Sequence, residues 1–257
     1  MIKLSVNLNR IALLRNSRGI GLPSVTHYAQ LAIDAGAQGI TVHPRPDQRH
    51  ITVQDVEQLQ QLLSSQPAIE FNIEGNPFTQ GPAAFLPLVK RIRPHQCTLV
   101  PDAEHQITSD HGWNLKAQVN VVRPIIDQLK TLGCWVSLFM DPDVDQIHLA
   151  HAAGADRVEL YTKPWADAYG RKHAEEVLHT YVQAMQTACS LGMQVNIGHD
   201  LNLQNLPTFV AQMKDVAEAS IGHALTCDAL EYGYVNTVKA YQAALNGKDF
   251  TPFLHKN

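Results

Sequence analysis

Residues 39–65 read GITVHPRPDQRHITVQDVEQLQQLLSS and contain one strand, one loop and one helix. The stretch begins with Gly-Ile-Thr-Val, a short apolar and β-branched run that is typical of a buried parallel strand. It ends with residues 52–65, which start at Thr52, a candidate N-cap, and continue with apolar residues at the helical period. Between the two lie two histidines, two arginines and two prolines. The unit therefore places titratable and cationic groups where an apolar strand stops.

This alternation recurs along the chain. Strands are predicted at residues 3–7, 39–43, 70–74, 96–100, 135–139, 157–161, 194–198 and 218–222. Helices are predicted at residues 24–36, 52–65, 114–133, 142–154, 170–192, 203–213 and 223–247, and Pro124 should kink or split the third of them. Tandem units of this kind predict a (β/α)8 TIM barrel. A doubly wound open sheet is the alternative, although no Gly-rich dinucleotide loop follows any strand.

The bulk composition narrows the class of protein. The chain has 257 residues, of which 45% are hydrophobic, and no Pro-, Gly- or Ser-rich linker divides it, so a single domain over residues 1–257 is predicted. A formal net charge of −4 does not suit a nucleic-acid-binding surface. No leader segment is evident, and no apolar run approaches the ~18–20 residues that cross a bilayer, so a cytoplasmic protein without membrane contact is expected. The cysteines, which form no CxxC pair, are expected to be reduced thiols: Cys97, Cys134, Cys189 and Cys227.

Polar residues stand where several predicted strands end. In a (β/α)8 barrel these positions meet at one mouth, so His43, Glu74, His199 and His223 are expected to converge there. The remaining inner strand residues are expected to be Val, Ile, Leu and Phe. A structural role for Glu74, paired with an arginine, is the plainer alternative. The other histidines of helices and loops are expected to be solvated: His95, His105, His111, His148, His151, His173, His179 and His255.

Two connections after strands are long, and both lie at the same end of the predicted barrel. Residues 10–23 form an arginine-rich loop in this prediction, and residues 101–113 form a longer loop of the kind that acts as a lid. The arginines of the rim are Arg10, Arg18, Arg45 and Arg49. Guanidinium groups hold phosphate bidentately, and Gly222 at a strand-to-helix turn offers further backbone N–H donors.

A metal site is the first alternative at this mouth. His43, His199, His223 and Glu74 could form a His/carboxylate cluster. No HxH or HExxH spacing is present, however, and the neighbouring arginines disfavour a divalent cation. No metal is therefore expected.

Five segments together resemble the pyridoxine 5′-phosphate synthase family. They are VNLNRIALLRNSRG (6–19), GITVHPRPDQRHI (39–51), FNIEG (71–75), VNIGHDLN (195–202) and SIGHAL (220–225). The resemblance implies a TIM barrel with extra helices that assembles into a homo-octamer. It implies condensation of 1-deoxy-D-xylulose 5-phosphate with 3-amino-2-oxopropyl phosphate to give pyridoxine 5′-phosphate, phosphate and water, with no metal or organic cofactor.

The resemblance also implies roles for individual residues. Proton transfer would fall to His43, Glu74 and His199. From the chemistry of ring formation we further hypothesise that Glu74 acts on C–H and water-linked steps, His43 on amine and hydroxyl protons, and His199 on the leaving group. The amino-ketone phosphate would contact Asn7, Arg18, Gly222 and His223. The sugar phosphate would contact Asn9, Arg10, Arg45, His50 and, when the lid closes, Thr108. Position 200, here Asp200, also lines the family's site.

The chain departs from the commonest family pattern at a few positions. Asn9-Arg10 stands in place of an Asp-His pair, Asp200 in place of Gly, and Tyr161 in place of a frequent His, while residues 225–233 lack the usual Arg. None of these changes removes a proposed proton-transfer residue. Two alternatives remain open: a non-catalytic phosphate-binding paralogue, and another sugar-phosphate isomerase or aldolase, for which Lys163 is the nearest candidate Schiff-base lysine.

Overall fold

The fold is that of a computed structural model in which residues 1–103 and 106–255 are described. The chain forms a closed parallel barrel in which the strands follow one another in sequence order, β1 to β8. The strands are β1 (Lys3–Asn7), β2 (Gly39–Val42), β3 (Glu70–Gly75), β4 (Gln96–Leu99), β5 (Trp135–Met140), β6 (Arg157–Leu160), β7 (Gln194–Ile197) and β8 (Val216–Ile221). The predicted TIM barrel is confirmed, and each predicted strand lies within two residues of an observed one.

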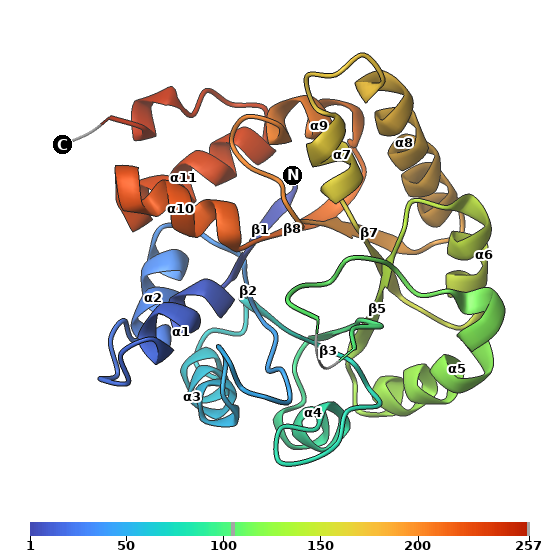
Figure 1. The fold of residues 1–257 in the computed structure, drawn as a ribbon, viewed down its shortest axis with the longest axis horizontal. Helices are drawn as coiled ribbons and strands as arrows, with labels where there is room; N and C mark the ends of the chain where they lie inside the picture. Colours follow the sequence, from blue (N-terminus) through green and yellow to red (C-terminus); the bar gives the residue numbers. More distant parts are fainter. Residues whose placement is uncertain (104–105, 256–257) are drawn as a thin grey trace.

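Helices surround the barrel on all sides in Figure 1. They are α1 (Asn9–Asn16), α2 (Val25–Asp34), α3 (Val53–Leu63), α4 (Phe85–Ile92), α5 (Leu115–Thr131), α6 (Val144–Ala152), α7 (Lys163–Ala168), α8 (Ala174–Ser190), α9 (Leu206–Gln212), α10 (His223–Tyr232) and α11 (Tyr234–Leu245), followed by a 3-10 turn at Thr251–Phe253. Their apolar faces pack on the outward side chains of the strands, such as Leu4, Ile40 and Ile73, which are fully buried. This layer between the strands and the helices is the main hydrophobic core.

Several helix predictions need correction. Residues 10–23 are not a loop throughout, because α1 occupies Asn9–Asn16 and buries Ile11 and Ala12. The predicted helix 223–247 is two helices that meet at Gly233, whose φ of 78° does not continue a helix. The helices α4 and α7 were not predicted.

Pro124 does not split its helix. The helix α5 runs without interruption from Leu115 to Thr131. A proline leaves the carbonyl four residues earlier without a partner, here that of Asn120. Both Asn120 and Pro124 are exposed. Water can therefore satisfy the freed carbonyl, which explains why the helix tolerates the proline.

The inner wall of the barrel is polar, and the prediction of apolar inner residues was wrong. Side chains alternate along a strand, so the inward positions are Ser5, Thr41, Asn72, Thr98 and their neighbours around the ring, while Val, Ile and Leu face the helices. Ser5 Oγ lies 2.7 Å from Thr41 Oγ1, and Thr98 Oγ1 donates to Asn72 Oδ1 at 3.1 Å. Hydrogen bonds between neighbouring strands thus replace apolar packing inside the barrel.

The amino end of the barrel is closed by charged residues. Arg157 pairs with Glu70, donates to Gln96 and lies 4.0 Å over the ring of Trp135. Asn196 Nδ2 donates to Gln96 Oε1 at 3.1 Å and approaches Glu218 Oε1 at 3.5 Å. Arg157, Gln96, Asn196 and Glu218 are buried in this network, and the residues discussed next lie at the opposite, carboxyl end of the barrel.

The exposed histidines follow the prediction. His95, His111, His148, His151, His173, His179 and His255 are all exposed, while His105 lies outside the described residues.

Candidate active site

A cavity of about 550 Å³ lies at the carboxyl end of the barrel. Its wall contains every predicted site residue except Arg18: Asn7, Asn9, Arg10, His43, Arg45, His50, Glu74, Thr108, His199, Asp200, Gly222 and His223. These residues come from strand ends and loops that are widely separated in sequence. Arg18 is exposed in the segment after α1 and does not line this cavity.

Glu74 and His43 stand side by side at the ends of β3 and β2. Oε2 of Glu74 lies 3.8 Å from Nδ1 of His43, and both side chains are buried. Asn7 Nδ2 lies 3.5 Å from the same Glu74 oxygen, and Asn7 Oδ1 accepts the backbone N–H of Asn9 at 3.0 Å. The side chain of Asn9 in turn accepts the backbone N–H of His43 at 2.9 Å. A chain of amides from β1 therefore holds this acid–base pair in place.

Burial shifts both groups toward their neutral forms. It raises the pKa of Glu74 to about 7, against the opposing attraction of His199. It also holds the pKa of His43 well below its usual value, with further repulsion from Arg45 and His50. At neutral pH His43 is uncharged and Glu74 titrates, so the contact between them is not an ion pair. A carboxyl group with such a pKa can both accept and return a proton.

Arg45 and His50 present donors on one side of the cavity. Arg45 Nη2 donates to Asp102 Oδ2 at 2.5 Å, and Ser109 Oγ donates to the same oxygen at 2.8 Å. His50 Nδ1 accepts the backbone N–H of Ile51 at 2.9 Å, which leaves the ring hydrogen on Nε2. Burial lowers the pKa of His50 to about 4, with added repulsion from Arg45 and Arg10. A neutral N–H donor and a guanidinium group therefore face the cavity together.

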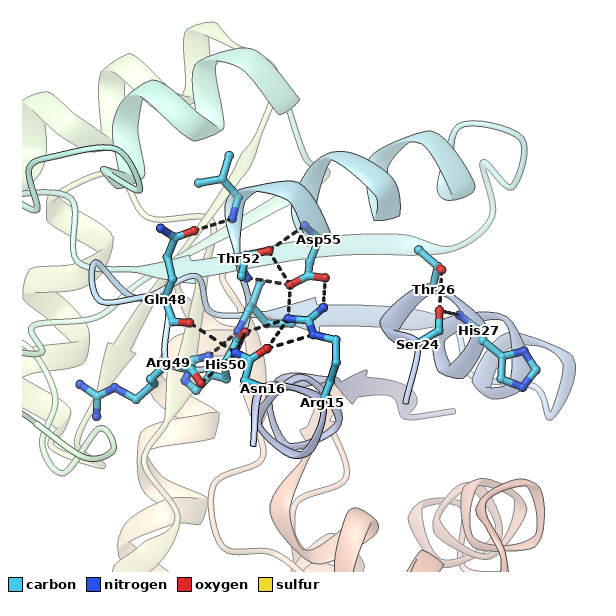
Figure 2. Close-up of polar contacts among 12 residues, drawn as sticks. Arg15, Asn16, Ser24, Thr26, His27, Gln48, Arg49, His50, Thr52 and Asp55 are labelled. Atoms are coloured by element: carbon cyan, nitrogen blue, oxygen red, sulfur yellow. Dashed lines mark hydrogen bonds and ion pairs between the residues drawn. The ribbon is translucent and has the colours of Figure 1, made fainter. Parts of the chain in front are cut away.

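The loop that carries His50 is tied to α1, as Figure 2 shows. Asn16 Nδ2 lies 2.8 Å from the carbonyl oxygen of His50, 3.0 Å from that of Arg49 and 3.4 Å from that of Gln48. Arg15 Nη2 reaches the His50 carbonyl at 3.2 Å while its guanidinium group pairs with the buried Asp55. Asp55 also completes a capping box with Thr52 at the start of α3. We call this set of contacts the α1 clamp.

His199 lies on the opposite side, at the end of β7. Its Nδ1 is 2.8 Å from Asp200 Oδ2, and its Nε2 is 2.9 Å from Thr108 Oγ1. Its ring packs edge-on against Tyr161, with centroids 5.4 Å apart. The hydrogen bond with His199 lowers the pKa of the Asp200 carboxyl. Both ring nitrogens of His199 therefore have partners.

The long connection between β4 and α5 crosses the mouth of the barrel (Figure 1). Among its described residues, Ile107, Thr108 and Ser109 line the cavity. It is held at both sides, because Thr108 contacts His199 and the carbonyl of Gln106 accepts from Arg49 Nη1 at 3.1 Å. The described part of this connection therefore forms one wall of the cavity.

Gly222 lies at the turn from β8 into α10, beside Asn7. A Cβ atom at this position would lie 3.0 Å from the Cβ of Asn7, so a larger residue would displace a side chain of the cavity wall. His223 is the first residue of α10 and lines the cavity next to it. The first turn of this helix therefore lies at the mouth, and the first N–H groups of a helix have no partner within the helix.

The cavity also contains residues that were not assigned to the site from sequence. Ser109, Phe139 and Glu159 are among them, and Arg49, which was predicted as a rim arginine, also lines the cavity. Burial, together with repulsion from Glu74, raises the pKa of Glu159 well above its usual value. Its position near the end of β6 was a signal that could have identified it. Lys163, by contrast, lies on the surface and pairs with Asp167 at 2.8 Å.

Within the described part of the chain, no group of three or more His, Cys, Asp or Glu residues is arranged to hold a metal ion. The described helices include none that is long and apolar enough to span a membrane.

A parallel eight-stranded barrel with acid–base groups and arginines around one mouth defines a TIM-barrel enzyme. The family model described as "Pyridoxal phosphate biosynthesis protein PdxJ" matches residues 4–247. The chain belongs to this family, whose curated members are named pyridoxine 5′-phosphate synthase and are enzymes of vitamin B6 biosynthesis. The family resemblance seen in the sequence is confirmed.

Individual relatives match over nearly their whole length. The chain is 52% identical to pyridoxine 5′-phosphate synthase of Albidiferax ferrireducens, covering 93% of this chain and 95% of that protein. It is 49% identical to the Brucella abortus enzyme of that name, covering 95% and 99%. Among solved structures, phosphoribosyl anthranilate isomerase of Thermotoga maritima superimposes with a TM-score of 0.58 at 10% identity, over 96% of this chain and 100% of that one. That last likeness concerns the barrel fold alone.

Proposed function

We propose that this chain condenses 1-deoxy-D-xylulose 5-phosphate with 3-amino-2-oxopropyl phosphate to give pyridoxine 5′-phosphate, phosphate and water. The observation that carries the proposal is the convergence of Glu74, His43 and His199 in one cavity whose rim bears arginines. Membership of the family and the names of its curated relatives support the same reaction.

The proposed division of proton transfer follows from the protonation states. Ring formation requires amine addition to a ketone, loss of water, carbon–carbon bond closure and aromatisation, and every step moves a proton. Glu74, with a pKa near 7, is suited to accept a proton from carbon and return it to departing water. The uncharged His43, 3.8 Å away, is suited to accept protons from the amine and hydroxyl groups. His199 is assigned the protonation of the leaving group.

Two anion pockets are proposed on opposite sides of the cavity. Arg45 and His50, with Asn9, Arg10 and Thr108, are assigned to the sugar phosphate. Gly222 and His223, with Asn7, are assigned to the amino-ketone phosphate, and Arg18 is assigned to the same substrate although it lies outside the cavity wall. The segment 106–113 is proposed to act as the lid that excludes water from imine intermediates. No metal or organic cofactor is assigned a step.

The remaining attributes rest on the family. A single catalytic domain over residues 1–257, a cytoplasmic location and a homo-octamer are proposed. Leu13, Leu14, Ile20 and Leu22 support self-association, because all four are exposed apolar residues on α1 and the segment after it. Sedimentation equilibrium should give the mass of eight chains, and a stable monomer or dimer at micromolar concentration would contradict the assembly.

The deciding experiment is the formation of pyridoxine 5′-phosphate from the two purified substrates, with Glu74→Gln as the inactive control. An inactive wild type under saturating substrates would favour a non-catalytic phosphate-binding paralogue. For a Schiff-base aldolase, borohydride reduction in the presence of substrate should leave an adduct on Lys163. The exposed ion pair of Lys163 with Asp167, away from the cavity wall, argues against that outcome.

A further inference from the structure

His199 contacts Asp200, which stands where the family usually has glycine. Asp200 has φ of 64°, in the left-handed region that favours glycine and that few other residues adopt. The surrounding backbone is held in place, because Leu201 N–H donates to the Gly198 carbonyl at 3.1 Å and Asn205 Nδ2 donates to the Asp200 carbonyl at 3.2 Å. Within this turn the carboxylate reaches back to the preceding histidine.

The geometry at the ring fixes which nitrogen carries the hydrogen. A carboxylate can only accept, so the 2.8 Å contact with Asp200 Oδ2 requires hydrogen on Nδ1 of His199. Nε2 then faces Thr108 Oγ1 at 2.9 Å, at the lid side of the cavity. In a free neutral imidazole the hydrogen resides mainly on Nε2, so the carboxylate selects the less common tautomer.

Other charged and titratable groups face this pair from the elements around it. Tyr161, which directly follows β6, packs on the ring, and Glu74 of β3 interacts with it electrostatically across the cavity. Lys163 and His223 act on Asp200. In the described part of the chain none of these four groups hydrogen-bonds to the His199 ring, so Asp200 is the charged group that can set its tautomer.

We propose that Asp200 is a positioning residue for His199: it holds the hydrogen on Nδ1 and leaves Nε2 as the atom that exchanges a proton with the substrate. This inference rests on the proposed function, in which His199 protonates the leaving group. Nε2 first accepts a proton released in an earlier step of the condensation, and the resulting imidazolium then returns this proton to the departing oxygen. The N–H of Nδ1 stays bonded to the carboxylate throughout, as in the His–Asp pair of serine proteases. The side chain of Asp200 then acts through His199 and need not touch either substrate.

The first test reads the tautomer without any substrate. Nitrogen-15 NMR of the imidazole rings, with His199→Gln to assign the signals, should show Nδ1 of His199 protonated in the neutral wild-type ring. In Asp200→Gly the hydrogen should move toward Nε2, while Asp145→Asn, a matched loss of charge on the exposed face of α6, should leave the signals unchanged. A wild-type ring protonated on Nε2, or one unaffected by Asp200→Gly, would overturn the proposal.

The second test separates positioning from substrate contact. Asp200→Asn keeps the shape and tolerates a positive φ, but its amide can donate to Nδ1 and stabilise the wrong tautomer. We expect kcat to fall about tenfold in Asp200→Gly and at least as far in Asp200→Asn, with both KM values within about threefold of wild type. A rise in KM at unchanged kcat, or full activity of Asp200→Asn, would overturn the proposal. If the wild type formed no pyridoxine 5′-phosphate, the proposed function would fail while the NMR result would still decide the role of Asp200.

Discussion

Two buried carboxyl groups on the inner wall of the barrel have similar pKa shifts and different surroundings. Glu74 lies at the mouth, where it faces a cavity and has His43 within 3.8 Å. Glu218 lies at the closed end, among Asn196, Arg157 and Glu70, and does not line that cavity. Burial is the main cause that raises the pKa of Glu74 to about 7 and that of Glu218 to about 8.

The comparison shows that in this barrel a raised carboxyl pKa does not by itself mark a catalytic group. Any carboxylate on the polar inner wall loses water and shifts in the same direction. What distinguishes Glu74 is access to the cavity and a neighbouring neutral imidazole. Variants at the two positions should therefore separate the effect on catalysis from the effect on stability.

Glu74→Gln is expected to have the largest effect. It removes the group that accepts protons while keeping its size, so kcat for pyridoxine 5′-phosphate formation should fall roughly a thousandfold. Circular dichroism and thermal melting should show a folded protein. Retention of more than a tenth of wild-type activity would mean that Glu74 is not the base.

A change of pH should have the second-largest effect on activity. Glu74 accepts a proton only when ionised, so kcat/KM should fall about tenfold per pH unit below about 7 and level off above it. The neutral His43, with its pKa well below 6.5, should add no second limb near neutrality. The Glu218→Gln variant should show the same profile. A flat profile between pH 5.5 and 7.5 would contradict the assignment of Glu74.

Glu218→Gln should change stability with little change in activity. In the unfolded chain this carboxyl ionises near 4.5, whereas in the folded protein it stays protonated to about 8, so the fold loses stability as pH rises between these values. The variant should exceed wild type in free energy of unfolding by roughly 1–3 kcal/mol at pH 8, with the gain much reduced at pH 5. Urea unfolding at both pH values measures this. A variant less stable than wild type at pH 8 would indicate an ionised Glu218 paired with Arg157.

The smallest effect is expected for the α1 clamp. Asn16→Ala removes the contacts to the carbonyls of residues 48–50 and the side-chain oxygen that accepts from Arg15, whereas the Arg15–Asp55 pair itself involves no atom of Asn16. Losing about 1 kcal/mol of loop positioning should raise KM for the sugar phosphate about fivefold, with kcat and the KM of the amino-ketone little changed. Ser17→Ala, which loses only a bond to Leu14 within the same turn, is the matched control. An equal rise in both KM values would point instead to general loosening.

Much of the fold could be predicted because the local sequence patterns indicated the same elements that the structure contains. The short β-rich runs marked all eight strands, and their ends marked the mouth where the cavity lies. The missed α4 had such a signal, since Phe85, Leu88, Val89 and Ile92 are spaced on one helical face and all are buried. The missed α1 had a weaker one, because it buries only Ile11 and Ala12 and leaves Leu14 exposed.

The polarity of the inner wall could not be inferred from composition. In most strands apolar and polar residues alternate, although β5 is mainly apolar, and the sequence does not say which set faces inward. Closing the barrel decides this, because the helices need the apolar set and the inner ring is left with Ser5, Thr41 and Asn72. The protonation states of Glu74 and Glu218 follow from that closure.

The sequence by itself determined the order of the eight units, the family and the identity of the groups at the mouth, because these depend on local periodicity and on residue types at fixed positions. Only the tertiary structure decided which of those groups share a cavity, how far burial shifts the pKa of each, and that Asp200 reaches Nδ1 of His199. The physical reason is that solvation and hydrogen-bond geometry depend on neighbouring groups that folding brings together from distant strands. No single stretch of the chain contains all of these groups.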